Sequence, residues 1–176
     1  MKIKNTFFIL FFLFIISSLY AENDIEILPK YMDFIYTKPV KAENLDVMPF
    51  GVSAQFEAGN SFWGMTMGFD WQHINNISYS PFEIGLSLQV PLMIGKLFTF
   101  HPYAGVSGDL CLWNDNPIYG FSWFTGTRLI IHCNMATEPG INIFYKHVYY
   151  FPIRRNENKI DVGKIGIGLS LYMSVF

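Results

Sequence analysis

The chain has 176 residues, of which 51% are hydrophobic, 18% aromatic and only 15% charged. A soluble domain of this size carries more charge on its surface, so the composition indicates a membrane protein. With 12 basic and 14 acidic residues the formal net charge is -2, which excludes the basic surface that nucleic-acid-binding proteins use.

The first 21 residues have the three parts of a secretory signal peptide. Lys2 and Lys4 precede an apolar run over residues 7–16, and smaller residues lead to a plausible cleavage site after Ala21. The run is shorter than the roughly 18 residues that a helix needs to cross a bilayer, so a retained membrane helix is the weaker alternative. We predict export, a short periplasmic segment over residues 22–28 and one domain over residues 29–176.

Apolar and polar residues then alternate with a period of two, which predicts β-strands. The pattern is clearest over residues 63–72, where Trp63, Met65, Met67 and Phe69 alternate with glycine, threonine and aspartate, and it recurs over residues 82–92. Five more segments alternate less cleanly. They are residues 50–58, 98–112, 119–132, 141–149 and 164–175.

The length and the two faces of these strands favour a barrel that crosses a membrane. Transmembrane barrels use strands of about 9 to 11 residues, with apolar side chains outside and small or polar ones inside. Single-chain bacterial barrels have an even number of strands, so the seven visible segments require an eighth. Only residues 29–40 are left to form it, although apolar and polar residues alternate poorly there. The predicted fold is all-β, an antiparallel up-and-down transmembrane β-barrel of eight strands.

The strand order assigns each connection to one side of the membrane. Residues 41–46, 74–81, 113–118 and 152–160 are predicted to lie outside the cell. Residues 59–61, 93–96 and 133–140 are predicted to lie in the periplasm, and the last of these is longer than a periplasmic turn needs. Cys111 and Cys133 then lie near opposite rims, beyond the about 7 Å that a disulfide allows between Cα atoms. We therefore predict free thiols.

The signal peptide, the strand number, the short turns and the terminal Phe176 resemble the small outer-membrane barrels of the outer membrane protein A, X and W type, over essentially the whole mature length. The resemblance implies an outer-membrane location after signal-peptide cleavage and a monomer surrounded by outer-membrane lipid. It also implies insertion by the barrel-assembly machinery with periplasmic chaperones. Tyr172 and Phe176 would belong to the C-terminal assembly signal, although Ser170 and Ser174 stand where that signal has apolar residues.

Several charged residues fall on the inward faces of the predicted strands. The interior of an eight-stranded barrel is just wide enough for side chains to fill it, so these acids and bases should pair across the lumen. We favour a structural polar plug over the alternative, a cation-selective constriction. The residues are Glu57, Asp70, Glu83, Asp109, Arg128, Lys146 and Lys164.

Aromatic residues near the strand ends are expected at the two membrane interfaces. We interpret them as anchors rather than as a surface for stacking carbohydrate. They are Trp63, Trp71, Trp113, Tyr119, Tyr149 and Tyr150.

His147 is the only hint of catalysis. It is predicted on an outward face, and residues 145–149 loosely resemble the lipid A deacylases, which carry a serine two residues after the histidine and an acid further on. Here Tyr149 replaces that serine, so the nucleophile is missing, although Glu157 could serve as the acid. No metal-ligand spacing or cofactor motif is present, so we expect no metal and no cofactor.

These observations predict a non-enzymatic outer-membrane barrel with a structural or surface-interaction role, and no nucleic-acid partner. A narrow pore for small solutes, a lipid A-modifying hydrolase and a soluble periplasmic barrel are the alternatives. A basic external loop carrying Arg154, Arg155 and Lys159 could contact lipid phosphates or simply be solvated.

Overall fold

The computed structural model describes residues 28–42, 46–74, 77–79, 81–113, 116–151 and 160–173. Within these ranges no helix is long and apolar enough to cross a membrane. The described residues form ten strands. They are β1 (Leu28–Ala42), β2 (Val47–Gly59), β3 (Trp63–Ile74), β4 (Ile77–Tyr79), β5 (Phe82–Gln89), β6 (Leu92–Ile94), β7 (Phe98–Trp113), β8 (Asn116–Ile131), β9 (Thr137–Phe151) and β10 (Ile160–Met173).

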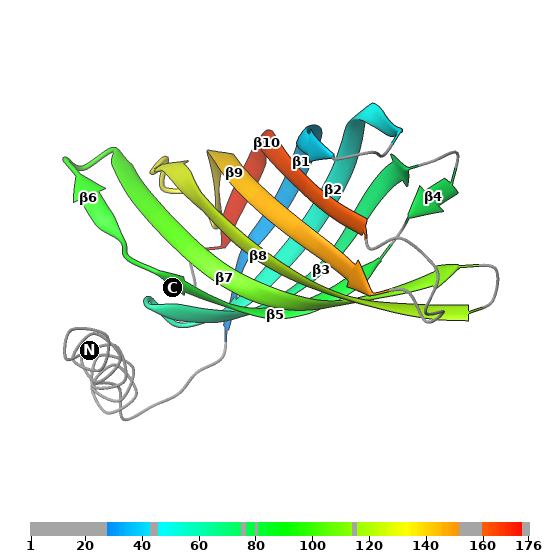
Figure 1. The fold of residues 1–176 in the computed structure, drawn as a ribbon. Coiled ribbons are helices and arrows are strands. Elements are labelled where there is room, and N and C mark those ends of the chain that lie inside the picture. The colour runs from blue at the N-terminus through cyan, green and yellow to red at the C-terminus, as the bar shows by residue number, and fades with distance from the viewer. Residues whose placement is uncertain are drawn as a thin grey trace, which may run out of the picture.

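The strands close into a ring (Figure 1). Every pairing is antiparallel, and β1 pairs with both β2 and β10, so that Phe34 lies opposite Ala54 on one side and Leu169 on the other. The short strands β4 and β6 add to β3 and β7 respectively and leave eight long strands around the ring. The predicted eight-stranded, up-and-down barrel is confirmed, including the first strand, for which the sequence pattern was weakest.

The two ends of the barrel differ. We call the end where β1, β3, β7 and β9 finish the distal end; it carries β4 and the β7–β8 connection, on the right of Figure 1. The opposite, proximal end carries β6 and the β8–β9 connection. The sequence prediction assigns the distal end to the outside of the cell and the proximal end to the periplasm.

One predicted strand is interrupted. Residues 82–92 were expected to be continuous, but β5 stops at Gln89 and pairing with β7 resumes in β6 at Leu92. Pro91 lies in the break, and a proline has no backbone N–H to donate to the ladder. The chain then turns through Gly95, whose φ of 68° suits a residue without a side chain.

Several strand boundaries also differ from the prediction, and the largest differences are at the starts of β9 and β10. β9 begins at Thr137, so the β8–β9 connection is shorter than the expected residues 133–140. β10 begins at Ile160 rather than at residue 164, which places Asp161 in a strand. Both extensions carry non-apolar residues at outward positions, and the alternation therefore gave no signal there.

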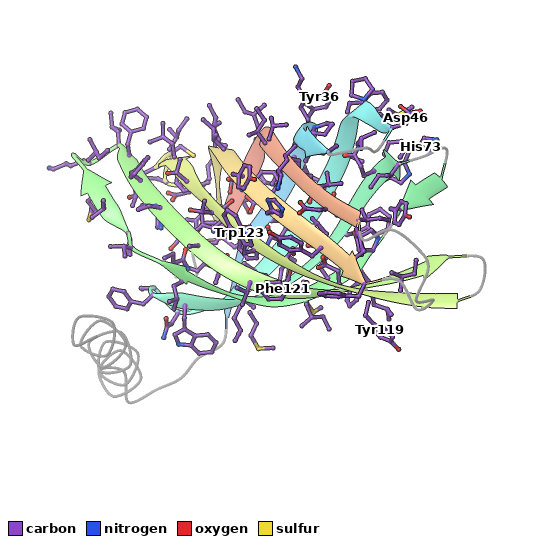
Figure 2. All side chains as sticks on the ribbon, in the orientation of Figure 1. Tyr36, Asp46, His73, Tyr119, Phe121 and Trp123 are labelled. Carbon is purple, nitrogen blue, oxygen red and sulfur yellow. The ribbon has the colours of Figure 1, made fainter. Side chains whose placement is uncertain are left out.

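Apolar side chains cover the outside of the barrel, as the sticks in Figure 2 show. Along β5, Phe82, Ile84 and Leu86 are exposed, whereas Glu83 and Gly85 between them are buried. A continuous apolar outer band is what a transmembrane barrel presents to lipid. The core of the molecule is therefore its lumen, which is largely polar.

Candidate functional site

The lumen is built in layers that can be followed along β9. Every second residue of this strand points inward: Asn142, Phe144, Lys146, Val148 and Tyr150 are all buried. From the proximal end to the distal end, the lumen holds a charged layer, an apolar layer, a second charged layer and a second apolar layer.

Arg128 is the centre of the proximal charged layer. Its side chain is fully buried, and Nη2 donates to Asp33 Oδ2 at 2.8 Å and to Glu57 Oε2 at 3.0 Å. The guanidinium carbon also lies 4.1 Å and 4.2 Å from the ring centres of Tyr31 and Tyr103. One cation therefore pairs with two carboxylates in a fully buried site.

The distal charged layer holds two lysines and three acids. Lys146 pairs with Glu83 and lies 3.5 Å from Asp70 Oδ2, while Lys164 also pairs with Asp70. Asp109 completes the layer and accepts a hydrogen bond from Ser107 Oγ at 3.1 Å. The five charged groups come from β3, β5, β7, β9 and β10, so this layer ties most of the ring together.

Apolar residues fill the space between and beyond these layers. Ile35, Tyr103, Phe124 and Phe144 form the middle layer. A larger cluster closes the distal part of the lumen. Its buried members are Ile74, Tyr79, Ile118, Val148, Tyr150, Ile160 and Val162. The cavity that this cluster shares with Asp70 and Lys164 has a volume of only about 10 Å³, roughly the space of one water molecule.

All seven inward charges named from the sequence are buried in the lumen. The structure divides them, with Glu57 and Arg128 in the proximal layer and the other five in the distal layer. Sequence reasoning missed Asp33, which binds Arg128. The signal was present, since Asp33 has the same parity as Tyr31 and Ile35, but the poor alternation of β1 concealed it.

The predicted interface aromatics do not all face outward. Trp63, Trp71, Tyr119 and Tyr149 lie on the outward parity of their strands, and Figure 2 labels Tyr119 near the distal end of β8. Tyr150 is a correction: it is 5% exposed and packs in the distal lumen. Because Tyr149 and Tyr150 are consecutive in a strand, their side chains must point to opposite faces.

Of the remaining predicted residues, Tyr172 is described, whereas Trp113 and Phe176 lie partly or wholly outside the described residues. Trp113 is the last residue of β7, and its side chain lies outside the described set, as does Phe176. Tyr172 points into the proximal lumen, where its ring centre lies 5.3 Å from that of Tyr31. Residues 1–27, which include the predicted signal peptide, also lie outside the described residues.

His147 lies on the outward parity of β9 but is only 5% exposed. The rings of Trp123 and Tyr149 stack on it, with centres 5.7 Å and 4.5 Å away. Its Nε2 is 2.6 Å from Asp161 Oδ1 and its Nδ1 is 3.0 Å from the Tyr145 hydroxyl. The acid beside this histidine is thus Asp161, whereas Glu157, which the sequence suggested, lies outside the described residues.

Cys133 is free and exposed, as predicted, in the β8–β9 connection. The side chain of Cys111 is outside the described set. In the part of the chain that the structure covers, no three His, Cys, Asp or Glu side chains converge where they could hold a metal ion.

Comparison with models of known families and with curated proteins gives no match. Three solved structures are similar in fold. Neisserial surface protein A is 9% identical, with a TM-score of 0.56 over 87% of this chain and 100% of that one. A structure described as "De novo design of transmembrane beta-barrels" is 10% identical, with a TM-score of 0.50 over 85% and 100%. Outer membrane protein AlkL in lipid bilayers is 12% identical, with a TM-score of 0.43 over 88% and 94%.

At these identities the likeness concerns the fold alone. Together with the closed ring and the apolar outer band, the likeness to the first two of these structures defines the class of the protein. The chain is a small eight-stranded transmembrane β-barrel, and its fold is that of small outer-membrane barrels, as the sequence resemblance implied.

Proposed function

We propose that this protein is a non-conducting barrel of the bacterial outer membrane, with a structural or surface-interaction role and no catalytic activity. The observation that carries the proposal is the filled lumen. Two buried charged layers and two apolar layers of the described residues occupy it, and the cavity that Asp70, Tyr150 and Lys164 line has a volume of about 10 Å³. A solute could pass only if several buried ion pairs broke at once, which is strongly unfavourable.

The outer-membrane location is tested by fractionation. We expect the protein in the detergent-extracted outer-membrane fraction, with a gel mobility that changes on heating, because a closed barrel resists unfolding by detergent at room temperature. Recovery in the soluble periplasmic extract would contradict the proposal.

The absence of conduction is tested in planar bilayers. Purified protein should give no steady single-channel openings. If openings appear and are lost in Asp70→Ala but persist in Leu86→Ala, whose side chain faces outward, the charged layer is a selective constriction and the pore alternative is correct.

One observation favours a second candidate, a lipid-modifying hydrolase. The Asp161–His147 pair, with a hydroxyl at the other ring nitrogen, has the order of acid, base and hydroxyl that nucleophilic catalysis uses. The hydroxyl belongs to Tyr145, and the Tyr149 ring stacks where the deacylase pattern has its serine. Mass spectrometry of lipid A from cells with and without the protein tests this candidate. We expect the same acyl chains in both, and a lost chain would revive the enzyme.

A further inference from the structure

Lys38 breaks the pattern of the outer face of β1. The outward residues around it, Phe34, Tyr36 and Val40, are exposed and apolar, and Lys38 is exposed among them. The cost of a cation on the lipid-facing side of a barrel falls as it approaches the interface, where anionic headgroups can meet it. An outward lysine toward the end of β1 therefore marks a candidate lipid contact.

An apolar groove runs over the outer face beside Lys38. Its volume is about 610 Å³, within the range of small-molecule sites. The groove crosses four adjacent strands, β1, β10, β9 and β8. Its walls include Tyr36, Lys38, Ile143, Tyr145, Ile165 and Ile167.

A chain of polar contacts leads from the groove to a second lysine. Tyr145 lines the groove and contacts His147, which contacts Asp161, and Asp161 Oδ2 lies 3.6 Å from Lys41 Nζ. Gly163 leaves room for this chain, because a Cβ at that position would lie 2.6 Å from the Tyr145 hydroxyl. This chain of contacts holds Lys41 on the same outer face as Lys38, nearer the distal end.

We propose that this groove binds one molecule of lipid A, the phosphorylated, acylated glycolipid of the outer leaflet. An acyl chain lies in the groove, and a phosphate contacts Lys38 and Lys41. This assignment goes beyond the proposed structural role. It rests on the proposed outer-membrane location and on the sequence prediction that puts the distal end outside the cell.

The position and the charge of the site fit this ligand. Lys41 is the next to last residue of β1 and Asp161 is the second of β10, so the polar end lies at the distal rim, at the level of lipid headgroups. The groove extends from there toward the middle of the barrel, where acyl chains lie. Charge-assisted bonds from lysine to phosphate supply the selectivity for an anionic lipid.

The charge requirement is tested by native mass spectrometry of folded protein in detergent, titrated with lipid A. We expect one bound molecule, and binding that is weaker by about tenfold or more when lipid A is dephosphorylated or when both lysines are changed in Lys38→Gln/Lys41→Gln. Lys96→Gln, in the exposed turn at the proximal end, is the matched control and should bind as the parent does. Equal binding of the dephosphorylated lipid, or equal loss in the control, would overturn the proposal.

The groove is tested separately with its charges intact. Ile167→Trp fills the groove and should reduce binding of lipid A about tenfold, whereas Ile84→Trp, an equally exposed outward position on β5 that does not line it, should not. Unchanged binding in Ile167→Trp would exclude the groove. Phosphatidylglycerol bound as tightly as lipid A would show that the glycolipid assignment is wrong.

Failure of this inference is distinguishable from failure of the proposed function. Heat-modifiable mobility in the outer-membrane fraction and silent planar bilayers test the closed barrel without reference to lipid. The heat-modifiable mobility also establishes that each variant is folded before its lipid binding is compared.

Discussion

At the scale of single residues, the lumen depends on compensated charge. Arg128, Asp33 and Glu57 are all buried, and each would be costly alone. Removing one partner of a buried ion pair leaves an uncompensated charge, whereas replacing the whole group with apolar residues is often neutral. The ion triad therefore constrains which single changes the barrel tolerates.

We expect Arg128→Met to destabilise the folded barrel by about 3 to 5 kcal/mol, because it leaves two carboxylates unpaired. The measurement is the urea midpoint, the concentration at which half of the protein in lipid vesicles is unfolded, with gel mobility distinguishing the folded from the unfolded form. The triple variant Arg128→Met/Asp33→Leu/Glu57→Leu should recover much of the loss. If the triple variant were less stable than Arg128→Met, the three charged groups would be net stabilising.

Gly166 sits where the middle apolar layer meets the barrel wall. An added Cβ would lie 2.1 Å from Phe144 Cε1 and 2.6 Å from Ile35 Cγ2. Gly166→Ala should therefore cost about 1 to 3 kcal/mol by overpacking. In Gly108→Ala, where the nearest atom is 4.0 Å away, the midpoint should hardly change. Similar losses in both variants would point to a general effect of strand glycines.

At the scale of elements, each long strand has one face for lipid and one for the lumen. β1 completes this arrangement, because its pairing with β2 and β10 leaves no unpaired edge in the ring. An open edge within a membrane would expose backbone N–H and C=O groups that lipid cannot satisfy. The fold thus requires β1 even though the side chains of this strand alternate poorly.

The lipid-facing band predicts a dependence on depth. Leu86 lies in the middle part of β5, whereas Leu97 lies in the turn at the proximal end, and both side chains are exposed. Leu86→Arg should destabilise by about 2 to 4 kcal/mol and Leu97→Arg by about 0 to 1 kcal/mol. The fraction folded into vesicles over a urea series measures the difference. Equal effects would mean that the apolar band does not lie in a bilayer at Leu86.

At the scale of the whole molecule, the orientation in the membrane can be tested by labelling. Asp46 is exposed at the distal end, where Figure 2 labels it, and Cys133 is exposed at the proximal end. A single cysteine at each position, with the other cysteines changed to serine, provides a matched pair. Asp46→Cys should react on intact cells with a maleimide too large to pass porins, and Cys133 should react only after permeabilisation. The reverse result would invert the assignment of the connections.

The sequence by itself determined the strands, their two faces and the class of fold. Alternation is a local property, since consecutive side chains of a strand point to opposite sides whatever the partner is. The inward charges could be named for the same reason. Even β1 followed from a rule about closed barrels rather than from its own residues.

Only the tertiary structure decided which side chains meet. Arg128 and Asp33 are 95 positions apart, and Lys164 and Asp70 are 94 apart. Strand tilt and the stagger of the register determine which side chains meet across a lumen. Neither can be read from the alternation of residues within one strand. The same reason explains Asp161, whose approach to His147 depends on where β10 begins and on how it is registered against β9.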